Sequence, residues 1–144
     1  NFCRENDELR KSLYPKKETI LFSKDGSVGT AYMLHENMQT VTSGAILHLT
    51  VKDKSKVLPA YLTLALNSEV VKQQSKRDAG GSIILHWRIS EIENVVVPIV
   101  DYDIQQQIAE LIEKSFYLCE ESKRLLDEAK DMVEKEIGKG NIEY

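Results

Sequence analysis

The chain of 144 residues, with 42% hydrophobic residues and a formal net charge of −4, has the size and composition of one globular domain with its own core. The sequence excludes a membrane-spanning helix, because no stretch reaches the roughly eighteen uninterrupted apolar residues that such a helix needs. The first residues, NFCRENDELRK, are too charged for a signal peptide. We therefore expect a cytoplasmic protein with no membrane partner.

Charge is unevenly distributed along the chain. Residues 1–88 contain thirteen Lys and Arg against nine Asp and Glu, whereas residues 89–144 contain six against fourteen. The first part is therefore suited to face a polyanion, and the second part would be repelled by one.

Three strands are predicted in the N-terminal half. ETILFS at 18–23 and VGTAYML at 28–34 flank KDGS, in which Asp25 and Gly26 are expected to supply the positive φ angles of a tight hairpin turn. SGAILHLTV at 43–51 alternates apolar and polar residues and predicts a third strand.

Helical periodicity follows over residues 58–77, where Pro59 suits a first helical turn and Asn67-Ser68 is expected to divide the segment into two helices. Gly80-Gly81 is expected to end the second helix, because two glycines cost too much backbone entropy inside it.

Two short elements are predicted next. SEIEN at 90–94 has the form of one capped helical turn. VVVPIV at 95–100 predicts a short buried or edge strand, in which Pro98 limits the hydrogen bonds to a neighbour.

The last predicted helix, residues 103–137, has Asp103 as its N-cap and Gly138 as its stop, and would be about 50 Å long. Small and apolar residues recur along it mostly at steps of three and four, as in a coiled coil: Ile112, Cys119, Ser122, Leu126, Ala129 and Val133. This pattern favours a partner helix over an amphipathic helix folded back on its own domain. The predicted fold class is α+β, with a small mixed α/β domain (1–101) that has a β-rich core, followed by a coiled-coil-type helix with a short tail (102–144).

Catalytic and metal chemistry is not indicated. Cys3 and Cys119 lie far apart with no histidine at metal-ligand spacing, so free thiols are expected rather than a zinc site or a disulfide. His35, His48 and His86 have no carboxylate or cysteine at ligand spacing, and no Ser-His-Asp set can be assembled. We expect no catalytic residue, no metal and no cofactor.

The order of these features resembles a known family. The KDGSVG turn, the TSGAILHL strand, the LPAYLTLALNSEVVKQQ helix, the GGS loop, ISEIENVVVPIV and DIQQQIAELIEKS together resemble a target recognition domain of type I restriction-modification specificity subunits, followed by that family's conserved helix. The resemblance extends from about Glu18 to Ile137, and the PIVDYDIQQQIAELI junction is its strongest part. The chain departs from the family at Val100-Asp101-Tyr102, where a second proline and an apolar pair are usual.

The resemblance implies a non-catalytic subunit that reads half of a split double-stranded DNA target. Its helix would set the spacing between halves and dock methyltransferase and restriction subunits. Typical specificity subunits contain two such domains and two such helices, so we expect a fragment of one, or a half-size subunit that pairs with itself. The alternative is a coiled-coil oligomerisation or adaptor protein whose small α/β head binds another protein.

Two candidate DNA-binding surfaces follow. Cations bracket the glycine loop of DAGGSIILHW, and a second set lies at the hairpin tip. Together these residues are Lys24, Ser27, Lys72, Lys76, Arg77, Gly80, Gly81, Ser82, His86 and Arg88. A solvated helix end and a simple turn are the plainer alternatives for the two sets. Trp87 is expected to pack in the core rather than stack on a base.

Overall fold

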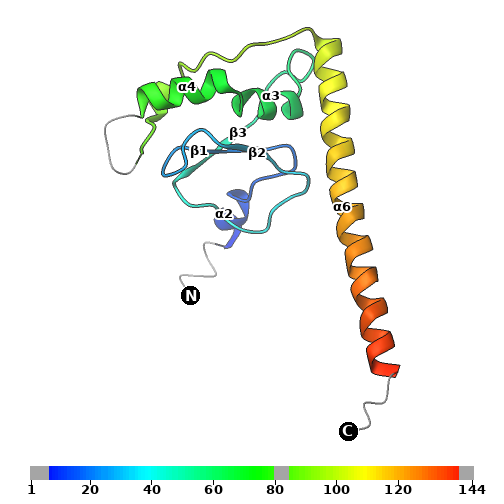
Figure 1. Cartoon of the computed structure of the whole chain (residues 1–144). Coiled ribbons are helices and arrows are strands. Elements are labelled where there is room, and N and C mark those ends of the chain that lie inside the picture. Colours follow the sequence, from blue (N-terminus) through cyan, green and yellow to red (C-terminus); the bar gives the residue numbers. More distant parts are fainter. Residues whose placement is uncertain (1–6, 80–84, 140–144) are drawn as a thin grey trace. The chain divides into compact units, whose positions relative to one another are not determined.

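The computed structural model describes residues 7–79 and 85–139 and confirms the α+β class (Figure 1). Three antiparallel strands form one sheet in the order β2-β1-β3, with β1 at Ile20–Ser23, β2 at Ala31–Met33 and β3 at Ile46–Leu49. The three predicted strands are therefore present, but each is shorter than its pattern.

The register of the sheet separates an apolar face from a polar one. Phe22 lies opposite Ala31 on one side and Leu47 on the other, and all three contribute to or pack against the core. Leu21 lies between Tyr32 and His48, which are both exposed. Because side chains alternate along a strand, Tyr32 and His48 belong to the face opposite the core.

The apolar face is covered by two helices, α3 at Pro59–Leu66 and α4 at Glu69–Asp78 (Figure 1). Pro59 occupies the first turn and the break falls at Asn67-Ser68, as predicted. The short helix α2, Asp7–Ser12, lies on the other side of the sheet and was not predicted. The buried core joins the sheet to these helices and to Trp87: Ile20, Phe22, Ala31, Leu66, Val71, Ala79 and Trp87.

The predicted tight turn between β1 and β2 is wrong. Gly26 and Gly29 have φ angles of 72° and 79°, whereas Asp25 is not among the described residues with positive φ. Ser23 closes a longer loop, because its N–H donates to the Thr30 carbonyl and its carbonyl accepts from Gly29 N–H, both at 2.9 Å. Two separated glycines provide the reversal, so the Asp25 side chain is free for other contacts.

The predicted helical turn is confirmed as α5, Ile89–Ile92, but the strand predicted at 95–100 is wrong, since this segment has no regular secondary structure. Side chains satisfy its backbone instead. Gln74 pairs with Val96 through two hydrogen bonds of 2.8 and 2.9 Å, and the Tyr61 hydroxyl donates to the Pro98 carbonyl at 2.6 Å. These side chains take the place that a neighbouring strand would have for Val96 and Pro98.

The long helix α6 spans Tyr102–Lys139, 38 residues, so both predicted ends are corrected. The Asp101 carbonyl accepts from Ile104 and Gln105 N–H at 3.0 Å, which places the helix start before Asp103. Asp103 lies in the first turn, where its carboxylate favours the helix dipole. Gly138 does not stop the helix, because glycine weakens a helix without requiring a left-handed backbone.

The chain divides into two compact units, unit 1 at Asn1–Ile108 and unit 2 at Ala109–Tyr144. The first turns of α6 belong to unit 1, and the rest of the helix is unit 2. In the part of the chain that the structure describes, no helix has the length and apolar character needed to cross a membrane.

Candidate nucleic-acid interface

The β1–β2 loop and the segment that precedes α5 lie side by side, although about sixty residues separate them in sequence. Gly26 N–H donates to the Leu85 carbonyl at 3.0 Å, and Trp87 N–H donates to the Lys24 carbonyl at 2.8 Å. Asp25 and His86 form the bridge between these two bonds. We call residues 24–30 and 85–88, with the last turn of α4, the loop cluster.

Trp87 anchors the loop cluster to the core. Its side chain is 0% exposed, and its ring lies 5.7 Å from that of Phe22. The prediction that Trp87 packs in the core is confirmed, and the ring is not available to stack on a base. Gly29 lies so close that an added Cβ would be 3.3 Å from Ser75 Oγ and 3.5 Å from the indole. Glycine therefore lets the loop rest on α4.

The Asp25 carboxylate joins the two segments of the loop cluster through side-chain contacts with Lys24 and His86. It accepts a hydrogen bond from Lys24 Nζ at 2.8 Å and contacts His86 Nδ1. The hydrogen bond from Lys24, followed by the one from His86, lowers the pKa of Asp25 below its usual 3.8. Lys24 is consequently committed to an internal ion pair, and only 15% of its side chain is exposed.

The other predicted cations of this region are largely neutralised. Lys76 pairs with Glu69 at 3.7 Å, Arg77 with Asp78 at 2.6 Å and Arg88 with Glu91 at 4.0 Å. The Arg77 hydrogen bond also lowers the pKa of Asp78. Exposed pairs of this kind contribute little to stability and can rearrange, but they cancel the local net charge. Lys72 enters none of the ion pairs found among the described residues.

The structure thus brings Lys24, Ser27, His86 and Arg88 onto one region with the end of α4. Ser27 is exposed at the loop tip, and its carbonyl accepts a hydrogen bond from Ser23 Oγ. Three further predicted residues, Gly80, Gly81 and Ser82, lie outside the described residues. The role of all these residues in DNA binding remains a prediction.

Three buried or half-buried side-chain amides bond backbone groups that have no strand partner, and the sequence did not reveal their role. Asn67 exchanges two hydrogen bonds with the backbone of Ala31, at 2.8 and 3.0 Å, along the outer edge of β2. Gln74 does the same for Val96. Gln105 is 0% exposed, accepts from Leu58 N–H at 3.0 Å and donates to the Lys56 and Val100 carbonyls at 3.1 and 2.9 Å.

The contacts of Gln105 give a structural role to one of the three consecutive glutamines near the start of α6. Its neighbours Gln106 and Gln107 are exposed, whereas the Gln105 amide ties the first turn of α6 to the segment before α3 and to the end of the 95–100 segment. Unit 1 therefore includes the first turn of α6, which Gln105 fixes to the rest of that unit.

The helix of unit 2 exposes two parallel apolar rows. The predicted row has Ile112 half-buried and the other four residues exposed: Cys119, Leu126, Ala129 and Val133. A second row, which the sequence analysis missed, repeats every seven residues and is 51–69% exposed: Leu111, Leu118, Leu125 and Met132. The small members of the predicted row, Ser122 and Ala129, continue the seven-residue step of Ser115 and lie between the Leu111 row and the line of Ile112, Cys119, Leu126 and Val133. Adjacent heptad rows with small residues between them are typical of a helix that packs closely against another helix.

The net charge of −4 lies entirely in unit 2, since unit 1 has thirteen Lys and Arg against thirteen Asp and Glu. The difference in net charge between the two parts of the chain is therefore smaller when the chain is divided at the boundary between the units than when it is divided at residue 88. A polyanion would meet unit 1 through a local patch rather than through an overall positive charge.

Within residues 7–79 and 85–139, no group of three or more His, Cys, Asp or Glu side chains is placed to hold a metal. Cys119 is a free, exposed thiol, and Cys3 lies outside the described residues.

Comparison with known proteins identifies the family. A family model described as "Type I restriction modification DNA specificity domain" matches residues 4–130. Among solved structures, the S subunit of a type I restriction-modification system from M. genitalium matches with a TM-score of 0.67 and 18% identity. The match covers 84% of this chain and 32% of that subunit, so the chain spans about a third of its length. No curated protein matches. Because the family model covers most of the chain, the protein belongs to the type I restriction-modification DNA specificity domain family.

Proposed function

We propose that unit 1 recognises one half of a two-part DNA target and that α6 sets the distance to the second half. The family match over residues 4–130 carries this proposal. It is supported by the loop cluster, which gathers Lys24, Ser27, His86 and Arg88 on loops held by a buried tryptophan. Recognition residues are commonly carried on loops that a rigid scaffold positions.

The second half-site requires a second recognition unit, from another copy of this chain or from the rest of a longer subunit. The two apolar rows of α6 supply a surface for the partner helix. The same helix would dock the methyltransferase and restriction subunits, while its acidic side chains keep it away from phosphates. A continuous helix of 38 residues fixes a distance in a way that a flexible linker cannot.

The test is binding of the intact chain to a fluorescent duplex across a range of salt concentrations. Phosphate contacts make the logarithm of the association constant fall linearly with the logarithm of salt concentration. The measurement should use concentrations at which the chain has associated, because one half-site alone binds without the avidity of the second. A coiled-coil adaptor with a protein-binding head predicts no duplex binding at any salt concentration. That result would refute the proposed function.

The chain itself should neither cleave nor methylate DNA. Mg²⁺-dependent cleavage or methyl transfer by the purified chain would contradict this part of the proposal.

A further inference from the structure

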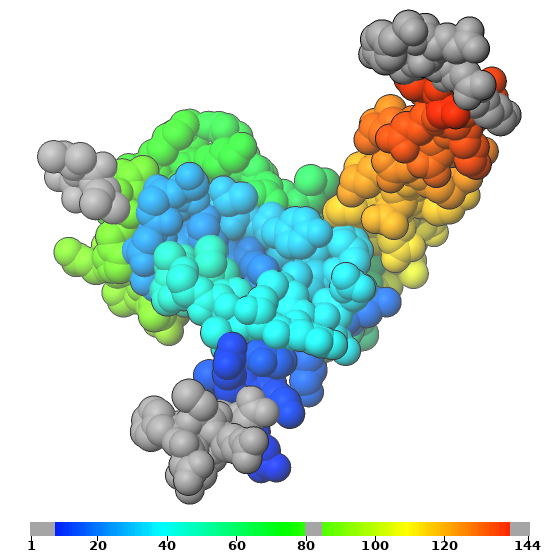
Figure 2. All heavy atoms as spheres, turned by 90° about the horizontal axis from the view of Figure 1, so that it is seen from below, coloured from blue at the N-terminus to red at the C-terminus, as the bar shows by residue number. Residues whose placement is uncertain are grey.

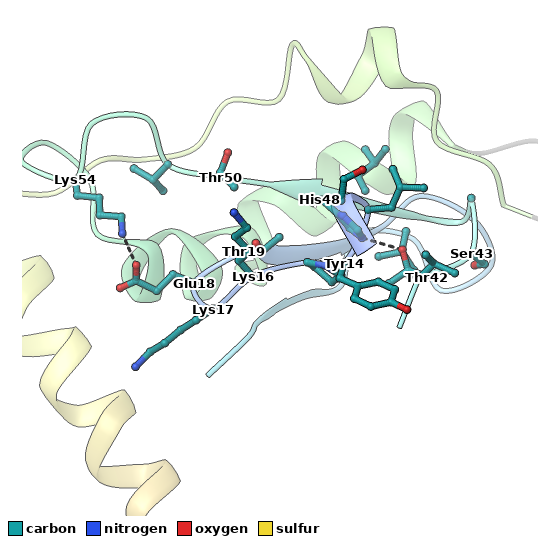
Figure 3. A pocket seen from close by; sticks show the side chains of 18 residues that line it. Tyr14, Lys16, Lys17, Glu18, Thr19, Thr42, Ser43, His48, Thr50 and Lys54 are labelled. Atoms are coloured by element: carbon teal, nitrogen blue, oxygen red, sulfur yellow. Dashed lines mark hydrogen bonds and ion pairs between the residues drawn. The ribbon is translucent and has the colours of Figure 1, made fainter. Parts of the chain in front are cut away.

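A hollow of about 780 Å³ opens beside β3, lined by residues 12–19, residues from 41 to 51 and Lys54 (Figure 3). His48 reaches it from the sheet face opposite the core, and the N-terminal half of the chain gathers around this side of unit 1 (Figure 2). None of the residues that line it belongs to the predicted DNA-binding set. The hollow therefore needs an explanation of its own.

The lining is positively charged. It contains Lys16, Lys17 and Lys54 but a single carboxylate, Glu18, which pairs with Lys54. Lys16 and Lys17 are exposed and enter none of the ion pairs found in the described part of the chain. In the loop cluster, by contrast, Lys24 and Arg88 each face a carboxylate. The hollow thus presents two adjacent cations without an ion pair among the described residues, whereas in the predicted set only Lys72 is left in that state.

Hydrogen-bond donors line the same hollow. Thr42 Oγ1 and His48 Nε2 lie 2.8 Å apart at the end opposite the Lys54–Glu18 pair, and Ser43 lies beside them (Figure 3). Lysines together with hydroxyl and imidazole groups are the side chains that contact phosphate and sugar oxygens of DNA.

One backbone feature sets the rim of the hollow. Glu18 has a φ of 67°, and it is the one non-glycine residue with positive φ among the residues described. Its N–H donates to the Leu34 carbonyl at 2.8 Å, and its side chain meets Lys54. A non-glycine residue in this region is strained, and such residues concentrate at binding sites.

The hollow adjoins the loop cluster. Lys24 N–H donates to the Ala45 carbonyl at 2.9 Å, and Ser23 lies opposite Ile46. Residues 43–46 thus border both surfaces. A duplex lying across unit 1 can meet both at once, with its backbone at one and its base edges at the other.

We propose that this hollow holds the sugar-phosphate backbone of duplex DNA through Lys16 and Lys17, while the adjoining loop cluster faces the bases. This inference rests on the proposed DNA recognition and locates the phosphate contacts at a surface outside the predicted residues. It divides the work as DNA-binding proteins generally do, with phosphate contacts positioning the protein and base contacts specifying the sequence.

The experiment compares the salt dependence of binding to a fluorescent random-sequence duplex for four double variants of the intact chain, one of which, Lys72→Ala/Lys76→Ala, alters the predicted DNA-binding set. Lys16→Ala/Lys17→Ala removes the proposed phosphate contacts, and Lys16→Arg/Lys17→Arg keeps their charge. Lys123→Ala/Lys135→Ala removes two exposed lysines from α6 as the matched control. The fluorescence of buried Trp87 reports that each variant is folded.

We expect Lys16→Ala/Lys17→Ala to flatten the log–log salt slope by about two phosphate contacts, equally for all duplex sequences. The arginine variant and the control should keep the wild-type slope. If the wild-type slope persists in Lys16→Ala/Lys17→Ala but Lys72→Ala/Lys76→Ala flattens it, the hollow is not the phosphate site and the proposed function still stands. If wild type binds no duplex, the proposed function fails and this inference fails with it. Tighter binding of an RNA duplex, through the same lysines, would overturn the assignment to DNA.

Discussion

Gln105 should be the most sensitive polar position in unit 1, and Gln105→Ala tests this. The substitution removes three hydrogen bonds. It leaves the N–H of Leu58 and the carbonyls of Lys56 and Val100 without their Gln105 partner. A buried polar group left unpaired costs about 1–3 kcal/mol, and water entering the vacated space offsets part of that cost. We therefore expect a loss of about 2–4 kcal/mol in the free energy of unfolding, a large share of the total of a typical domain.

Urea unfolding followed by the fluorescence of Trp87 measures this loss, because the chain has one tryptophan and its side chain is 0% exposed. The matched control is Gln106→Ala, the same substitution at an exposed position one residue along the helix, which should change stability by no more than about 0.5 kcal/mol.

A second variant separates hydrogen bonding from packing. Gln105→Glu keeps the shape and the acceptor for Leu58 N–H but places an oxygen against two carbonyls, so it should also destabilise unit 1, more at neutral than at acidic pH. Equal, small losses for Gln105→Ala and Gln106→Ala would refute the claim that this amide ties the helix to the domain.

Three further outcomes are expected. Gly29→Ala should destabilise unit 1 by more than the roughly 1–2 kcal/mol that a left-handed backbone costs an alanine, because its added Cβ would also crowd Ser75 and Trp87. Gly26→Ala should cost only the roughly 1–2 kcal/mol of the left-handed backbone, because nothing lies within 4 Å of an added Cβ. Equal losses in urea unfolding would contradict the close packing of Gly29 against α4. Leu126→Asp should place a charge in the helix pairing surface and abolish self-association in sedimentation velocity, and a wild type that is already monomeric would count against pairing between copies. Because the pKa of Asp25 is lowered in the folded chain, its ion pairing stabilises the fold fully above pH 3.8, and this contribution is lost as the pH falls through the lowered pKa. The difference in unfolding free energy between wild type and Asp25→Asn should therefore shrink as the pH falls below 3.8. A difference that persists unchanged in acid would disprove this stabilising role of the Asp25 carboxylate.

Local patterns predicted the elements of this fold well. The break at Asn67-Ser68, the single turn before the 95–100 segment, the long helix and the burial of Trp87 all follow from neighbouring residues. The 95–100 segment was misread because its backbone partner is the Gln74 side chain, 22 residues away from Val96 in the sequence. No periodicity within the segment carries that information.

The candidate site was harder to predict than the elements. The family was suggested by the order of motifs, and the comparison confirmed it. Which cations stay unpaired, however, depends on tertiary contacts: Lys54 pairs with Glu18, 36 residues away, while Lys16 and Lys17 have no carboxylate partner among residues 7–79 and 85–139. The hollow also combines residues 12–19 with residues from 41 to 51, which only the folded chain brings together. Counting charges along the sequence cannot reveal such a surface.

The most direct test of sequence-specific DNA recognition is selection of bound molecules from a pool of random duplexes, with the associated chain as bait. We expect selection to enrich one short motif, present twice at a fixed spacing when two recognition units are joined through α6. Lengthening α6 by two helical turns, seven residues, should change the spacing and leave the motif unchanged. A selected pool with no enriched motif, despite salt-dependent binding, would contradict the central claim that this domain reads DNA sequence.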